Sequence, residues 1–176
     1  MIKDIETYAF SHDDRLLLDA NIWLFTNGPM TYRYQNNADI YTKAVDKMSI
    51  NECEVYIIPT IISEFINRCI VEELRHMGIP KVDRKAARNL PLFKPIAEKI
   101  ANYVMDILSF AKCCDSPFDS LRVAAYMEEF KNCNADYNDI TIADACKERE
   151  LILVTDDYDF KNYPITVLTT NQDLLL

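Results

Sequence analysis

The stretch Asp136–Phe160, DYNDITIADACKERELILVTDDYDF, decides the fold. Its first half suits a helix that begins at Asp136–Asp139 and ends near Glu150, because aspartate is favoured at helix N-termini. Its second half opens with Leu151–Thr155, an apolar run of the length expected for a strand buried on both faces. A helix that leads directly into a buried strand is typical of α/β proteins with a parallel sheet.

The rest of the chain repeats this alternation of strands and helices. Apolar runs predict further buried strands at 15–18, 55–58 and 165–168. Helical spacing or helix-opening residues predict helices after Ala20, over 37–50, from Pro59 onward, within 78–117 and over about 118–131. We therefore expect one α/β domain over residues 1–176, with a mostly parallel sheet and a helical insertion at about 78–117.

Composition excludes several classes of protein. The 176 residues are 49% hydrophobic and 27% charged, as in an ordinary globular domain. The two glycines, Gly28 and Gly78, lie far apart, so no glycine-rich loop can cradle a nucleotide. No apolar run approaches the ~20 residues of a membrane helix, and Met1–Asp14 lacks a signal-peptide layout, so we expect a cytoplasmic protein that binds no membrane. The six cysteines form no C-x-x-C pair, and we expect reduced thiols.

The charge of the chain limits how it can bind nucleic acid. With 19 basic and 28 acidic residues the net charge is −9, which argues against binding by bulk neutralisation of phosphates. Any nucleic acid must be held locally. One basic cluster could bind the phosphates of a nucleic acid: Lys81, Arg84, Lys85 and Arg88. A cluster of this kind is more often a solvated face of a helix.

Acidic residues follow the predicted strands at the edge where α/β proteins build their sites. Asp19 and Asp156–Asp157 each follow a strand, Asp139 lies in the first turn of a helix, and Glu64 lies about one turn into another. Carboxylates that converge repel one another, so such a cluster predicts raised pKa values or a bound cation. Oxygen ligands favour hard cations such as Mg²⁺ or Mn²⁺.

Each acid taken singly also has an ordinary structural explanation. Asp139 can cap its helix, Asp156 and Asp157 can be turn residues, and Glu64 can be a solvated helix residue. Asp19 is the hardest to explain in this way, since an acid at the end of a buried strand needs a partner. The functional hypothesis therefore depends on convergence.

Four segments resemble the motifs of PIN domains, the nuclease domains of VapC-type toxins and of ribosomal RNA processing enzymes. Leu17–Trp23 resembles the opening L-L-D-x-N/S motif. Pro59–Phe65 resembles the second motif, in which a hydroxyl residue precedes the acid by about one turn. Asn138–Ala145 and Leu151–Phe160 resemble the closing pair, D-x-x-I-A-x-A and L-V-T-x-D-x-D-F.

The resemblance has consequences for fold and site. It implies a PIN-like three-layer α/β/α fold. The chain departs from the family pattern at about 78–117, which is longer than in the compact toxins of the family and leaves the substrate and any antitoxin partner open. It implies that the catalytic and metal-coordinating residues are Asp19, Glu64, Asp139 and Asp157. The supporting residues would be Asn21, Thr60, Thr155, Asp156 and Asp159.

The resemblance also implies an activity. A PIN domain of this kind would be an Mg²⁺- or Mn²⁺-dependent endoribonuclease that leaves 5′-phosphate and 3′-hydroxyl ends. Its partners would be an RNA substrate, an antitoxin protein if it is a toxin, and a second copy in a homodimer. Two alternatives stay open. One is a non-catalytic PIN-like scaffold in an RNA-processing assembly. The other is a phosphatase acting through a phosphoaspartate at Asp19, although Asn21 stands where such enzymes usually carry a second Asp.

Overall fold

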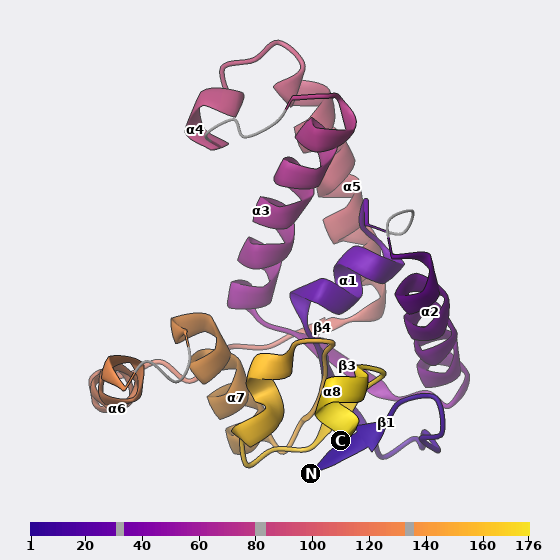
Figure 1. Cartoon of the computed structure of the whole chain (residues 1–176), viewed down its shortest axis with the longest axis vertical. Helices are drawn as coiled ribbons and strands as arrows, with labels where there is room; N and C mark the ends of the chain where they lie inside the picture. The colour runs from indigo at the N-terminus through magenta and orange to yellow at the C-terminus, as the bar shows by residue number, and fades with distance from the viewer. Residues whose placement is uncertain (31–33, 80–83, 133–135) are drawn as a thin grey trace.

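A six-stranded sheet forms the centre of the molecule (Figure 1). The computed structural model describes the chain except residues 31–33, 80–83 and 133–135. Every strand pair is parallel, and the spatial order is β1-β6-β5-β2-β3-β4. The strands are β1 (Ile2–Asp4), β2 (Arg15–Leu18), β3 (Glu54–Ile57), β4 (Lys112–Cys113), β5 (Ile152–Val154) and β6 (Val167–Thr169).

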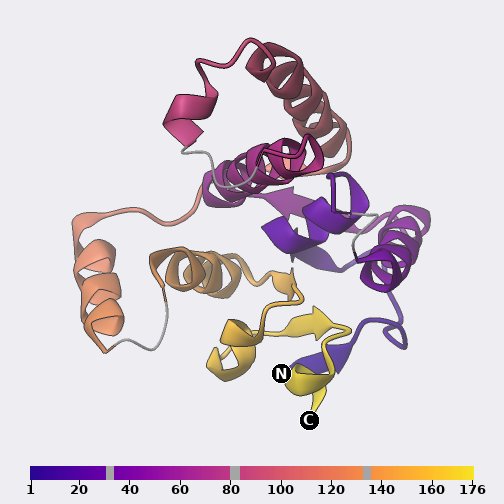
Figure 2. The same ribbon diagram turned by 45° about the horizontal axis from the view of Figure 1, so that its top comes forward.

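Helices cover both sides of this sheet. They are α1 (Ala20–Thr26), α2 (Gln35–Ile50), α3 (Pro59–His76), α4 (Arg84–Ala87), α5 (Phe93–Phe110), α6 (Ser120–Lys131), α7 (Tyr137–Arg149), α8 (Gln172–Leu175) and the 3₁₀ helix η1 (Tyr158–Asn162). Figure 2 shows α2 on one side of the sheet and α7 on the other, which confirms the three-layer α/β/α expectation. Among the described residues, no helix has the length and apolar character needed to cross a membrane.

The central strands are buried because their sequences are continuously apolar. Leu16, Leu17 and Leu18 of β2 are fully buried, as are Leu153 and Val154 of β5. Leu17 is paired with Leu153 in the register of β2 and β5. Burial on both faces is what parallel strands require, and it explains why these two strands could be located from sequence.

The sequence pattern missed the two edge strands, β1 and β4. Both are short, and β4 consists of the exposed pair Lys112–Cys113 within a region expected to be helical. Each is defined by pairing with one inner strand, β1 with β6 and β4 with β3. Edge strands this short carry no hydrophobic alternation, so no local signal marks them.

Helices α3 and α5 form an arm that rises away from the sheet (Figure 1). They pack against each other, and both contribute buried side chains to the hydrophobic core, among them Phe65, Cys69, Ile96 and Ile100. The short helix α4 lies near the far end of the arm. After α5 the chain returns to the sheet as β4, so the arm begins and ends at neighbouring strands.

Candidate active site

Asp19 is fixed at the end of β2 by three hydrogen bonds. Its carboxylate is 5% exposed. Oδ1 accepts from the backbone N–H of Ala20 at 2.6 Å, and Oδ2 accepts from Asn21 Nδ2 at 2.8 Å and from Thr155 Oγ1 at 2.7 Å. A buried carboxylate with this many donors has a defined position, as a metal ligand or a catalytic group requires.

The hydroxyl of Thr155 connects the ends of β2 and β5. It donates to Asp19 and accepts from Asn21 Nδ2 at 3.1 Å and from the backbone N–H of Asp157 at 3.0 Å. Thr155 is fully buried. One side chain therefore positions Asp19 relative to the turn that carries Asp157.

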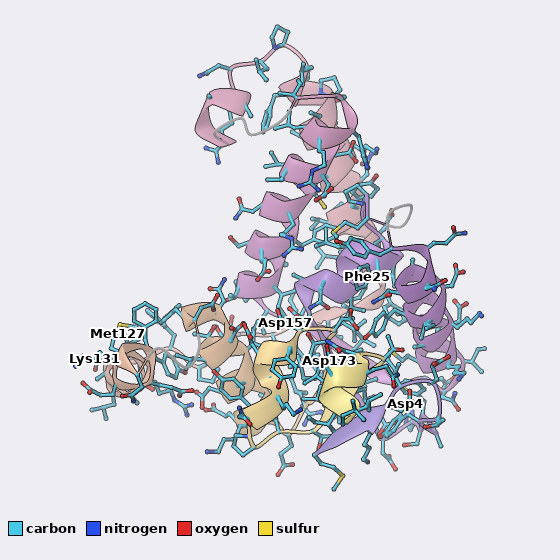
Figure 3. All side chains as sticks on the ribbon, viewed as in Figure 1. Asp4, Phe25, Met127, Lys131, Asp157 and Asp173 are labelled. Carbon is cyan, nitrogen blue, oxygen red and sulfur yellow. The ribbon has the colours of Figure 1, made fainter. Side chains whose placement is uncertain are left out.

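Asp157 lies on the open side of this network. Its side chain is exposed, and Oδ1 accepts from the backbone N–H of Asp159 at 3.0 Å, which caps η1. In Figure 3 Asp157 lies between the lower end of α3 and α7. Asp157 therefore does stabilise a turn, as its ordinary structural explanation predicted, and it also lies near the other acids.

The acid that caps α7 is Asp136, not Asp139. Asp136 Oδ1 accepts from the backbone N–H groups of Asn138 and Asp139 at 2.8 and 3.1 Å. The Asp139 carboxylate is therefore not needed as a cap. Burial and, after it, the negative charges of Asp136, Asp157, Asp159 and Asp19 together raise the pKa of Asp139 to about 7.

Glu64 approaches the same edge from α3. It is half-buried and forms an ion pair with Arg68 at 3.9 Å. Burial raises the pKa of Glu64, and the negative charges of Asp136 and Asp157 raise it further. The charge of Arg68 and a hydrogen bond from Asn138 lower it.

The four acids share one electrostatic environment. Burial raises the pKa of Asp19 to about 6, with Thr155 and Ala20 opposing the shift and the charges of Glu64 and Asp157 increasing it. Among the residues that the structure describes, no three acidic, cysteine or histidine side chains are arranged to hold one metal ion. The acids therefore sense one another's charge without already forming a coordination shell. Their oxygen-only donor set fits a hard cation such as Mg²⁺ or Mn²⁺.

Asp156 faces away from these acids and binds α2. Its Oδ2 accepts from Asn37 Nδ2 at 2.7 Å and its Oδ1 from the Tyr41 hydroxyl at 2.9 Å. Asn171 Nδ2 donates to the Asp156 carbonyl at 2.8 Å. Asp156 thus ties α2 and the C-terminal segment to the turn that carries Asp157.

Substituting Tyr41→Phe tests this connection. Tyr41 is fully buried, and its hydroxyl also accepts from the backbone N–H of Thr170 at 3.1 Å. We expect a loss of about 1–2 kcal/mol in the free energy of unfolding, because the half-buried Asp156 carboxylate and Thr170 N–H both lose the Tyr41 hydroxyl as a partner. Urea denaturation measures it. Tyr56→Phe, which removes a half-buried hydroxyl bound to Glu54, is the control and should cost less than about 0.5 kcal/mol. Equal losses for both variants would contradict the assignment.

The remaining predicted residues are placed differently. Thr60 is half-buried in the first turn of α3 and, within the described chain, makes no hydrogen bond to the acids. Lys81 lies outside the described residues, as do the side chains of Arg84 and Lys85 in α4. Arg88 is exposed just after α4, near the far end of the arm. Their role in nucleic-acid binding stays a prediction.

Sequence reasoning did not single out several residues that support the site. Asn37 and Tyr41 come from α2 and Asn171 from beyond β6, and no spacing links them to the acids. Asn138 and Asp136 had a signal, because both flank Asp139 in the same motif.

Comparison with known proteins identifies the fold. No protein-family model matches the chain. No curated protein matches it either. A solved structure described as VapBC2 from Rickettsia felis bound to a DNA fragment from their promoter is 18% identical, over 88% of this chain and 98% of that chain, with a TM-score of 0.54. The structure of PAE2754 from Pyrobaculum aerophilum is 16% identical, over 93% and 94%, with a TM-score of 0.48. The chain thus has the fold of a PIN/VapC-type domain.

Proposed function

We propose that this protein is a divalent-metal-dependent endoribonuclease that hydrolyses RNA phosphodiester bonds. One observation carries the proposal: acids from four separate segments share an electrostatic environment at the carboxyl edge of a parallel sheet. That edge is where α/β folds build their sites. The PIN/VapC-type fold supports the same activity.

The residues that would hold Mg²⁺ or Mn²⁺ are Asp19, Glu64, Asp139 and Asp157. A bound cation would supply electrostatic stabilisation to the phosphate under attack and lower the pKa of a water molecule. Asp19 would be the fixed ligand, because Asn21 and Thr155 hold its carboxylate. Asp157, being exposed, would reach the ion and the substrate from the solvent side. With a pKa of about 7, the Asp139 carboxylate can hold a proton at neutral pH until a cation replaces it.

The partners follow from the fold and the surface. The fold resembles that in the VapBC2 structure, which supports the proposal that this chain is the toxin of a toxin–antitoxin pair with an antitoxin partner. A homodimeric form and a cytoplasmic location belong to the same proposal. Large apolar side chains on and before α6 support a protein partner: Phe118, Leu121 and Phe130 are at least half exposed. With a net charge of −9, the chain must hold RNA locally.

A non-catalytic scaffold is the second candidate. It is favoured by the lack, within the described residues, of a preassembled three-ligand metal group. The phosphatase alternative has less support, because Asn21 donates a hydrogen bond to Asp19 where a second acid would be needed for proton transfer.

Cleavage of end-labelled single-stranded RNA tests the proposal. We expect products with Mg²⁺ or Mn²⁺, none in EDTA, and recovery when the ion is restored. The products should carry 5′-phosphate and 3′-hydroxyl ends. If the protein cleaves no RNA and millimolar Mn²⁺ does not raise its Tm, the scaffold is the correct function.

A further inference from the structure

A cleft lies beside the acids, between α6, α7 and residues 159–165. Its volume is about 630 Å³, which is within the range of small-ligand sites. Figure 2 shows α6 standing apart from the sheet, beyond α7. The side chains that matter for the argument are Tyr126, Glu129, Lys147, Asp159, Asn162 and Tyr163.

The cleft adjoins the four acids through Asp159. Asp159 is part of its lining, and the backbone N–H of Asp159 donates to Asp157 Oδ1 at 3.0 Å. Tyr163, from the same segment of the lining, is near enough to Asp139 for that negative charge to contribute to its raised pKa. A nucleotide whose phosphate lies at the acids can therefore place its base in the cleft.

Tyr163 supplies an aromatic wall and an unused polar group. Its ring packs against the buried Phe160 with centroids 5.7 Å apart. Within the described residues its hydroxyl is buried and makes no hydrogen bond of standard geometry. Burial raises the pKa of Tyr163, and the charge of the nearby Glu129 carboxylate and its contact with the hydroxyl act in the same direction. A buried hydroxyl without a partner is uncommon, and a ligand can satisfy it.

Two carboxylates of the lining can accept hydrogen bonds from a ligand, those of Glu129 and Asp159. Asp144 is already satisfied, because Arg122 Nη1 and the Tyr126 hydroxyl each donate to its Oδ2 at 2.6 Å. Glu129, in contrast, makes no ion pair in the described part of the chain, and Asp159 is exposed. Carboxylates accept hydrogen bonds from exocyclic amino groups of bases and repel phosphate. Uracil has no such amino group.

We propose that this cleft binds one nucleobase with an exocyclic amino group, such as adenine or cytosine, from the RNA strand held at the acids. The base stacks on Tyr163 and donates to Glu129 or Asp159. Lys147, the one cation among the lining residues, lies on α7 where an adjacent phosphate can reach it. The choice of RNA as the source of the base rests on the proposed function.

Binding of short fluorescent oligo(A), oligo(C) and oligo(U) to the full chain in EDTA tests the inference. Phosphate repulsion is the same for all three, so the ratio of their Kd values reports base recognition. We expect oligo(A) and oligo(C) to bind about tenfold more tightly than oligo(U), the order of one good hydrogen-bonded base contact. Glu129→Ala should remove most of this preference, and Tyr163→Leu, which removes the stacking ring, should weaken the binding of oligo(A) and oligo(C) and so reduce the preference. Glu128→Ala should keep it, because Glu128 pairs with Lys131 outside the cleft.

Equal Kd values for the three oligonucleotides would overturn the inference. It would also be overturned if both variants keep the wild-type Tm and the wild-type preference. Metal-dependent cleavage of all three without a preference leaves the proposed function standing and refutes the cleft assignment. A base preference that depends on Glu129, in a protein without metal-dependent cleavage, supports the cleft and refutes the nuclease.

Discussion

The Asp157→Asn variant should fold normally and cleave RNA more than about 100-fold more slowly than the wild type. Loss of a residue that only orients a metal ligand already costs roughly 10–100-fold, and Asp157 is a proposed ligand itself. The fold should survive because Asn caps a helix as well as Asp does, so the hydrogen bond from Asp159 is kept.

The matched control for this variant is Asp173→Asn. Asp173 is exposed at the start of α8, and no hydrogen bond joins its side chain to the four acids within the described residues. Initial rates of RNA cleavage with Mn²⁺, together with the Tm of each variant, show whether Asp157→Asn loses activity while it stays folded. Wild-type cleavage by a folded Asp157→Asn protein would exclude the catalytic assignment. Asp19→Asn is a poorer test, since three donors point at its buried oxygens and the new amide would oppose one of them.

Without divalent ions, the protein should lose stability as the pH rises from about 4 to about 7. The pKa values of Asp19 and Asp139 are raised to about 6 and about 7 by folding. The folded state therefore binds more protons than the unfolded chain across this window. Their contribution is complete below the ordinary pKa near 4 and is lost as each group ionises. Allowing for solvent screening at the half-buried Asp139, we expect a loss on the order of 2 kcal/mol.

Asp139→Asn should remove part of this loss. The Asp139 side chain makes no hydrogen bond within the described residues, so the substitution relieves repulsion and leaves the Asp136 cap in place. We expect its Tm at pH 8 in EDTA to exceed that of the wild type by roughly 2–6 °C. Added Mn²⁺ should raise the Tm of the wild type more than that of the variant. A wild-type Tm that does not change with pH, together with an unstabilised variant, would contradict the repulsion argument.

Local sequence was sufficient for the inner strands and most of the helices. β2 and β5 are continuously apolar because both faces are covered, and that pattern can be recognised without a structure. β1 and β4 could not be located in this way, since one inner strand defines each of them. A short edge strand that is defined by pairing with its neighbour has no apolar pattern of its own by which it could be predicted.

The acids were selected from sequence, but the network that holds them was not. The placement of Asp19, Glu64, Asp139 and Asp157 at strand ends and helix starts follows from motif order. Tyr41 and Asn37 reach the turn because α2 packs beside it, which is a property of the tertiary structure. The capping of α7 by Asp136 was ambiguous, since two aspartates occupy suitable positions and only geometry separates them.

The segments that carry the four acids are not equally well connected to one another. The hydroxyl of Thr155 couples Asp19 to the turn that carries Asp157, whereas Glu64 sits on α3, whose far end projects from the body of the molecule. A tilt of that helix about its first turn changes the separation of Glu64 from its three counterparts and leaves the threonine link intact. A molecule bound to the arm could therefore change the geometry of the four acids without contacting them.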